Sequence, residues 1–292
     1  MVAEPFIGSE AVAAGALTKT QLTTRCRRLF SDVYVMRDIH IDAEVRAKAG
    51  WLWSRRRGVI AGFSAAALHG SRWVDDRRAV ELIHDNRRNP PGIQTHRDHI
   101  EGDEIVLIAG MPVTSPARTA LDLGCWYPTM TAVAGMDALA RAVDVKAGDL
   151  ELLARSYPGR RGVARAREAI KLFDAGAQSP KESWLRVVLI QAGLPRPQTQ
   201  IPVLDEFGCA FAYLDMGWED VKVAVEYDGE QHRNDRRQYT WDVRRLESLE
   251  RLGWIDIRVL AGARPTEIVG RVRAALARRA LRERSARGRV CG

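Results

Sequence analysis

The order of hydrophobic patterns between residues 179 and 260 is the feature that most constrains how this chain folds. Apolar residues recur there at helical spacing, then in two short runs typical of strands, then again at helical spacing and in a third strand-like run. These segments are residues 179–193, 211–216, 221–227, 235–252 and 254–260. Followed by a further helix, they predict an α/β domain with a small mixed sheet flanked by helices.

The amino-terminal half is predicted to contain shorter helices and strands. Helices are expected from Ser9 to Gly15 and from Thr18 toward Leu29, and a short strand is expected at residues 33–35. Two helices followed by a β-wing are the outline of a winged helix-turn-helix, whose second helix enters the major groove of DNA. We therefore expect an α+β, winged-helix-like domain in this half.

Small and polar residues at 176–179 indicate a boundary between the halves. The chain has 292 residues, which is enough for two apolar cores. We expect a DNA-binding region at residues 1–176, the α/β domain at residues 177–276 and an arginine-rich tail at residues 277–292.

The net charge of +8 comes mainly from the carboxy-terminal end of the chain. Eight arginines and one glutamate lie between Arg271 and Gly292, so this segment carries seven of the eight net positive charges. Such a segment can hold phosphates, and it can equally be a solvated helix end. Further basic clusters at residues 25–28, 55–57 and 87–88 are compatible with DNA as a partner.

The location of the protein is constrained by what the sequence lacks. No segment has the roughly 18 or more consecutive apolar residues that span a bilayer, and the N-terminus lacks the plan of a signal peptide. The four cysteines are widely spaced without a CxxC pair, which argues against a disulfide framework or a zinc ribbon. We expect a cytoplasmic protein without a membrane partner, and a homodimer stays open.

Three carboxylates lie in the two adjacent predicted strands. Asp215 is in the first, and Glu226 and Asp228 are two residues apart in the second, so their side chains share one face. The turn predicted at residues 217–220 places Asp215 beside residues 221–223, and spacing alone does not bring it to Glu226. Gathered carboxylates suit Mg²⁺ or Mn²⁺, which activate water toward a phosphodiester. Carboxylates that simply face water are the structural alternative.

Sequence motifs give this region a narrower interpretation. The motif VEYDGxxH spans residues 225–232, the motif DxxRxxxLxxxGW spans residues 242–254, and SPKESWLR precedes both at residues 179–186. In this order they resemble the PD-(D/E)XK nuclease superfamily, and more narrowly an uncharacterised branch related to the very-short-patch-repair endonucleases. The resemblance covers about residues 177–276.

The resemblance implies a restriction-endonuclease-like fold and a metal-dependent cut at DNA phosphodiesters. It implies Asp215 and Glu226 as metal ligands and Glu182 as the helix carboxylate. For Glu182 a structural alternative exists, because it is the third residue after Ser179 in a capping box, where a glutamate returns a hydrogen bond to the cap.

One departure from the family pattern affects the chemistry. The superfamily usually has a lysine two residues after the second acid, and this chain has Asp228 there. Several related branches also lack that lysine, and those like the very-short-patch-repair endonucleases use a nearby histidine. His232 is therefore the candidate base, with an ordinary turn histidine as the alternative. Lys222 lies four residues from Glu226 and is a poor substitute. Arg244 is the candidate for contact with the scissile phosphate, and a helix ion pair is its structural alternative.

Four motifs in the amino-terminal half carry a second resemblance. They are AAGALT at residues 13–18, VYV at residues 33–35, SAAALHG at residues 64–70 and PVTSPARTALD at residues 112–122. These resemble proteins of the AbiEi antitoxin type with a winged-helix start. The resemblance implies DNA binding by residues such as Thr20, Arg25 and Arg28, and a merely structural helical domain is the alternative.

Together these features predict a DNA-processing protein, an Mg²⁺- or Mn²⁺-dependent endodeoxyribonuclease whose substrate is chosen by the amino-terminal module. Asp215 and Glu226 would hold the ion, and His232 or Asp228 would assist the attacking water. The main alternative is a non-catalytic regulator or antitoxin-like repressor with a degenerate nuclease domain. A plain interaction protein without a DNA role is a third interpretation.

Overall fold

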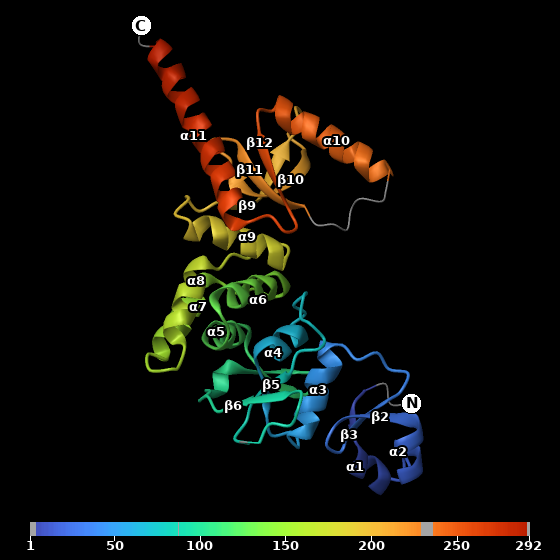
Figure 1. Ribbon diagram of the computed structural model, residues 1–292. Coiled ribbons are helices and arrows are strands. Elements are labelled where there is room, and N and C mark those ends of the chain that lie inside the picture. Colours follow the sequence, from blue (N-terminus) through green and yellow to red (C-terminus); the bar gives the residue numbers. More distant parts are fainter. Residues whose placement is uncertain (1–3, 87, 229–235, 291–292) are drawn as a thin grey trace. The chain divides into compact units, whose positions relative to one another are not determined.

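The computed structural model describes residues 4–86, 88–228 and 236–290 (Figure 1). The chain forms two compact units, residues 1–175 and residues 176–292. Both units combine helices with β-sheet, which is the mixed α and β content that the hydrophobic patterns predict.

The N-terminal unit begins with a small subdomain and continues into a larger mixed sheet and a group of helices. Its elements are β1 (Phe6–Ile7), α1 (Gly8–Ala13), α2 (Lys19–Arg25), β2 (Cys26–Phe30), β3 (Val33–Met36), α3 (Ala43–Trp53), β4 (Val59–Ile60), α4 (Gly62–Leu68), β5 (Val80–Ile83), β6 (Ile93–His96), the 3₁₀ turn η1 (Gly102–Glu104), β7 (Ile105–Ile108), β8 (Met111–Thr114), α5 (Pro116–Trp126), α6 (Thr129–Ala142), α7 (Ala147–Ser156) and α8 (Val163–Leu172). The strands form two sheets with the orders β1-β3-β2 and β6-β5-β4-β8-β7.

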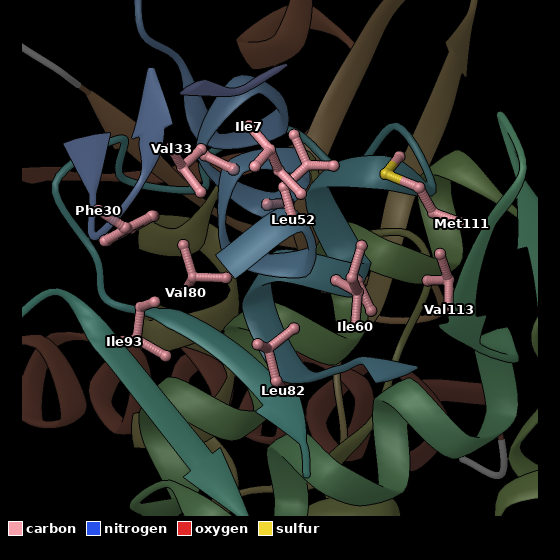
Figure 2. Close-up of a cluster of buried hydrophobic side chains, with 13 residues drawn as sticks. Ile7, Phe30, Val33, Leu52, Ile60, Val80, Leu82, Ile93, Met111 and Val113 are labelled. Carbon is pink, nitrogen blue, oxygen red and sulfur yellow. The ribbon is translucent and has the colours of Figure 1, made fainter. Parts of the chain in front are cut away.

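Helix α3 joins these two sheets into one core. Leu52 of α3 belongs to the same buried cluster as Ile7 and Val33 of the small sheet and Leu82 and Val113 of the larger one. Figure 2 shows these side chains converging from their separate elements. Burial of apolar surface contributes about 25 cal/mol per Å², so this shared cluster stabilises the small subdomain against the larger sheet.

The small subdomain differs from the sequence prediction in one element. The helix predicted to run from Thr18 toward Leu29 ends at Arg25, and the next residues form strand β2. β2 pairs with β3 in antiparallel register, with the buried Cys26 opposite Met36. Pairing with a neighbouring strand outweighs local helix propensity here, because it satisfies the backbone groups and buries a side chain at the same time.

A buried network of charged side chains ties the helices to the larger sheet. Arg118 of α5 is fully buried and pairs with Glu104 of η1 and, at 2.7 Å, with Asp122 one helical turn later. Arg160, just before α8, bridges Asp122 and Asp98 with N–O distances of 2.6 Å. Because Arg118 and Arg160 share Asp122, the network connects helix α5, the segment that contains Asp98 and Glu104, and the segment just before α8.

The C-terminal unit is a four-stranded mixed sheet with helices on both faces. Its elements are α9 (Pro180–Gln191), β9 (Gln198–Leu204), β10 (Ala210–Trp218), β11 (Val223–Asp228), α10 (Arg236–Arg251), β12 (Ile255–Leu260) and α11 (Pro265–Val290). The strand order is β12-β11-β10-β9, in which β12 runs parallel to β11 and the other pairs are antiparallel. Helices α9 and α11 pack on one face of the sheet and α10 on the other (Figure 1).

Strand β9 was not predicted by the pattern of the sequence. In the middle of β9, Ile201 and Val203 are both buried. Pro202 lies between them and is opposite Tyr213 of β10. β9 is at the edge of the sheet, where a proline is tolerated because no further strand needs its missing N–H. Local pattern disfavours a strand with a proline, and only the position at the edge makes it acceptable.

The carboxy-terminal arginine-rich segment continues a packed helix. Residues 277–290 belong to α11, whose earlier residues Ile268, Val272 and Ala275 are buried against the sheet. In the ranges that the structure describes, no helix is both long and apolar enough to cross a membrane.

Candidate nucleic-acid interface and carboxylate site

The first candidate site is the exposed surface of α2 and of the β2–β3 hairpin. Helix α2 begins with a capping box, in which the Thr18 hydroxyl accepts from the Gln21 N–H at 3.1 Å and the Gln21 side chain accepts from the Thr18 N–H at 2.8 Å. Leu22 is buried toward the core, whereas Thr20 and Arg25 are exposed. The outer face of α2 is therefore available to a partner.

Ion pairs engage three acidic side chains near this hairpin, those of Glu4, Glu10 and Asp32. Glu10 pairs with Arg56 at 2.6 Å, and Asp32 in the β2–β3 turn pairs with Arg55 at 3.1 Å. The hydrogen bonds from Arg56 lower the pKa of Glu10 below its ordinary value. Glu4 is likewise paired, so cations that lie in or just after α3 offset the negative charge beside the hairpin.

The arginines at the end of α2 and on β2 have no such partners. Arg25, Arg27 and Arg28 are exposed, and no carboxylate in the described part of the chain forms an ion pair with any of them. Arg27 and Arg28 are adjacent on β2, so they project to opposite faces of the hairpin. This arrangement leaves net positive charge at the end of α2 and along β2.

The second candidate site is formed by carboxylates on β10 and β11. Met216 is the register partner of Val225, so the preceding residue Asp215 lies across from the following residue Glu226. The Tyr227 N–H donates a hydrogen bond to Asp215 Oδ2 at 2.9 Å. Residues paired across two strands share a face of the sheet, so Asp215 and Glu226 lie side by side.

A third carboxylate, Glu182, lies close to Asp215. Glu182 is buried on α9, where its N–H donates to Ser179 Oγ at 3.2 Å and its Oε2 accepts from the Gln178 N–H at 2.7 Å. The return bond that the capping box predicts therefore reaches the residue before the cap. Burial, and then the negative charges of Glu182 and Glu226, raise the pKa of Asp215 to about 7.

Arg245 of α10 is the cation that enters this carboxylate site. Its two Nη atoms donate to the two oxygens of Glu226, with Nη1 to Oε2 at 2.9 Å, and Nη2 also donates to the Tyr213 carbonyl at 3.1 Å. Hydrogen bonds to Glu226 raise the pKa of Arg245 above its ordinary value. A bidentate pair of this kind is the strongest geometry available to an arginine and a carboxylate.

Two further acidic residues flank Glu226. Asp256 of β12 is opposite Ala224, and its Oδ2 accepts from Arg258 Nε at 3.3 Å. Asp228 is paired more loosely with the same arginine, from Arg258 Nη1 to Asp228 Oδ2 at 3.8 Å. Asp228, at the position where the nuclease resemblance predicts a lysine, is thus paired with a neighbouring cation.

The donor set can be compared with what a divalent ion requires. Within residues 4–86, 88–228 and 236–290, no group of three or more His, Cys, Asp or Glu side chains is arranged to hold a metal ion. Mg²⁺, however, is usually bound by one or two carboxylates and completes its shell with water and phosphate oxygens. Asp215 and Glu226 supply two carboxylates on one face of neighbouring strands, which is the number that such a site needs, and both oxygens of Glu226 are paired with Arg245.

The other predicted site residues have different outcomes. His232 lies outside the described residues, so its predicted role stays a prediction. Arg244 is exposed on α10, and the neighbouring Arg245 is the residue that contacts the carboxylates. Two signals would have favoured Arg245: the arginine of the DxxR motif is residue 245, and this residue lies one helical turn before the buried Leu249.

Several arginines of α11 have structural partners. Arg271 donates to the Arg258 carbonyl at 2.9 Å, Arg273 donates to the Ala192 carbonyl at 2.6 Å, and Arg279 donates to the Gly253 carbonyl. Ala192 and Gly253 are at the ends of α9 and α10, where helix carbonyls lack partners within the helix. Part of the carboxy-terminal positive charge therefore stabilises helix ends.

Comparison with known proteins finds relatives whose sequences match most of this chain. No solved structure matches this chain. The chain is 29% identical over 225 residues to uncharacterized protein MT2308 of Mycobacterium tuberculosis strain CDC 1551 and to uncharacterized protein Rv2248 of strain H37Rv. The matched region covers 76% of this chain and 81% of each relative. The resemblance of residues 177–276 to nucleases stays a prediction.

The match in the N-terminal unit is more informative. Residues 59–172, from β4 to the end of α8, match the family model of the AbiEi antitoxin C-terminal domain. This range contains the buried network around Arg118 and Asp122. The match confirms the AbiEi-like part of the sequence resemblance and identifies this region as similar to the C-terminal domain of the AbiEi antitoxin.

Proposed function

We propose that this protein binds duplex DNA through its small N-terminal subdomain. The observation that carries the proposal is that Arg25, Arg27 and Arg28 are exposed, while the nearby Asp32 and Glu10 are paired with Arg55 and Arg56. Arginines of this kind contact phosphates, and a helix followed by a β-hairpin has the order of elements of a winged helix-turn-helix. The antitoxin match over residues 59–172 supports a role related to toxin–antitoxin regulation.

Replacement of Arg25 and Arg28 by alanine tests this interface. Each variant is expected to weaken binding to duplexes of any sequence and to lower the slope of log Kd against log salt by about one, because one phosphate contact is lost. Fluorescence anisotropy across a salt series measures both quantities. Arg155→Ala, which removes an exposed arginine paired with Glu151, is the matched control and is expected to change neither. Unchanged slopes in both interface variants would place the DNA-binding surface elsewhere.

Within this DNA-binding role we propose that the C-terminal unit hydrolyses phosphodiesters with a bound Mg²⁺ or Mn²⁺. The proposal is supported by Asp215 and Glu226 lying across from each other, with Glu182 close enough to Asp215 to raise its pKa. Asp215 and Glu226 would hold the ion, which supplies an activated water and stabilises charge on the phosphate. Arg245 orients Glu226 by its two hydrogen bonds.

A DNA-binding regulator that does not cut is the second candidate. It is favoured by one specific observation, the pairing of both Glu226 oxygens with Arg245, which meets the charge requirement of Glu226 without a metal ion. The aspartate at residue 228, in the place of the family lysine, points in the same direction.

Plasmid cleavage distinguishes the two candidates. The full chain is incubated with supercoiled plasmid in Mg²⁺, in Mn²⁺ and in EDTA, beside Glu226→Gln and beside Glu250→Gln, an exposed glutamate on α10. The nuclease proposal predicts metal-dependent nicking that falls at least tenfold, about 1.4 kcal/mol in activation free energy, in Glu226→Gln only. Binding without nicking supports the regulator, and equal nicking by all three proteins would indicate a contaminating nuclease.

A further inference from the structure

An apolar cavity lies between the small N-terminal subdomain and α3, next to the surface that we propose binds DNA. It is bounded by β1, α1, the segment between α1 and α2, the end of α2, β3 and α3, and its volume is about 630 Å³. Sites that bind small molecules usually have volumes of about 300–1,000 Å³. The cavity therefore has the size of a ligand site, and its apolar lining has no part in the functions proposed above.

The lining of the cavity is mostly hydrophobic. Ile7 of β1 and Leu52 of α3 form part of its wall, and both belong to the buried cluster shown in Figure 2. The lining also includes two aromatic and two aliphatic side chains, those of Phe6, Trp51, Leu17 and Met36. An apolar molecule placed here is removed from water, and an aromatic ring in it can stack on the two rings of the wall.

The charged residues of the lining set a second requirement for the ligand. They are three cations, Arg25, Lys48 and Arg56, and one acid, Glu10. Lys48 pairs with Glu4 and Arg56 pairs with Glu10, so these two cations already have counter-ions. Arg25, the last residue of α2, forms no ion pair with a carboxylate in the ranges that the structure describes. An apolar wall beside one such guanidinium is complementary to an apolar molecule with a single anionic group.

We propose that this cavity binds a small apolar carboxylate, whose body packs against Phe6 and Trp51 and whose carboxylate pairs with Arg25. For its effect on DNA the inference rests on the proposed DNA-binding function, because Arg25 is also an expected phosphate contact. A guanidinium that is paired with a ligand is less available to a phosphate. The ligand is therefore expected to weaken DNA binding, which makes the small subdomain a ligand-responsive DNA-binding module.

Calorimetric titration of the full chain with 2-naphthoate, an aromatic carboxylate, tests the cavity. The uncharged 2-naphthamide has nearly the same shape and is expected to bind at least tenfold more weakly, because it cannot form the ion pair. Ala11→Phe places a ring in the cavity and is expected to abolish binding of 2-naphthoate. Ala13→Phe, the same substitution at an exposed residue of α1 outside the lining, is expected to bind like the wild type. Arg25→Ala is expected to bind the two compounds equally.

Fluorescence anisotropy with a labelled duplex measures the link to DNA binding. Saturating sodium 2-naphthoate is expected to raise the Kd of the wild type for DNA at least threefold, relative to the same concentration of sodium chloride. The comparison with sodium chloride removes the effect of added salt on phosphate contacts. The same addition is expected to leave the Kd of Arg25→Ala unchanged, and 2-naphthamide is expected to change neither protein.

The outcomes separate this inference from the proposed function. A wild type that binds neither compound, or that binds both equally, would overturn the inference, and so would 2-naphthoate binding that Ala11→Phe retains. Unchanged DNA affinity in saturating 2-naphthoate would overturn the competition for Arg25. Binding of 2-naphthoate that requires the open cavity and Arg25, in a protein that does not bind duplex DNA, would retain the ligand site and overturn the proposed DNA-binding function.

Discussion

Replacement of Arg118 by methionine is expected to destabilise the N-terminal unit by about 3–5 kcal/mol, the cost of breaking a buried ion pair from one side. Arg118 is fully buried and pairs with Glu104 and Asp122. Although burial acts in the opposite direction, Asp122 raises the pKa of Arg118 above its ordinary value. Loss of the guanidinium would leave both carboxylates buried, and among the described residues Arg160 would be the cation still paired with Asp122.

The loss in free energy of unfolding is expected to be larger than that from breaking a single ion pair. Tyr157 also donates to Glu104, at 2.8 Å to Oε1, and lies with Arg118 over its ring at 5.2 Å. Removing one member of such a network leaves the others without partners in a region of low dielectric constant. Arg118→Met keeps most of the side-chain volume, so the change reports on charge and hydrogen bonding more than on a cavity.

Urea unfolding measures this prediction, and amide hydrogen exchange in α5 reports on the N-terminal unit separately. Arg155→Met is a matched control, because Arg155 and Glu151 also form a pair four residues apart on a helix but are mostly exposed, at 71% and 54% of their side-chain area. Exposed pairs contribute about 0–1 kcal/mol. Comparable losses in the two variants would show that the buried network does not stabilise the unit in the way proposed.

Replacement of Asp215 by asparagine is expected to stabilise the metal-free protein above neutral pH. The pKa of Asp215 is about 7 in the folded chain, against 3.8 ordinarily. A raised folded pKa means that the stability contributed by the protonated form is present below pH 4 and is lost as the pH rises through about 7. The difference between these two pKa values corresponds to a loss of as much as about 4 kcal/mol in the free energy of unfolding by pH 8.

The measurement is unfolding free energy between pH 5 and pH 8 in EDTA, for wild type and Asp215→Asn. The wild type is expected to lose stability as the pH rises, and the variant is expected to lose less, because asparagine keeps an acceptor for the Tyr227 N–H and carries no charge. Part of the slope is expected to remain in the variant, since burial and Glu226 also raise the pKa of Asp256, to about 6. Parallel pH profiles for the two proteins would show that Asp215 is not the group that titrates.

Local chemistry was sufficient to predict several elements of the C-terminal unit. Ser179, Pro180 and Glu182 indicate a helix start, and α9 begins at Pro180 with the Ser179 hydroxyl accepting from the Glu182 N–H. Capping depends on residues within one turn of each other, so a short segment contains all the information needed. The boundaries of α10 and β12 likewise follow from apolar spacing and from the stop at Gly253.

The candidate site required information that no segment contains. The predicted turn at residues 217–220 would have left Asp215 beside residues 221–223, whereas β10 continues through Trp218, so the turn lies at residues 219–222 and Asp215 is across from Glu226. A shift of register by an even number of residues does not change which face a side chain takes, so the alternation of apolar residues is the same in both arrangements.

The sequence by itself determined the order and type of most elements, the cap of α9 and the presence of acidic residues in two neighbouring strands. Only the tertiary structure decided that Asp215 meets Glu226, that Arg245 and not Arg244 contacts them, and that Asp256 lies on the same face. The physical reason is that caps and helix faces depend on residues close in the chain. Strand register and the packing of α10 on the sheet depend on contacts between segments far apart.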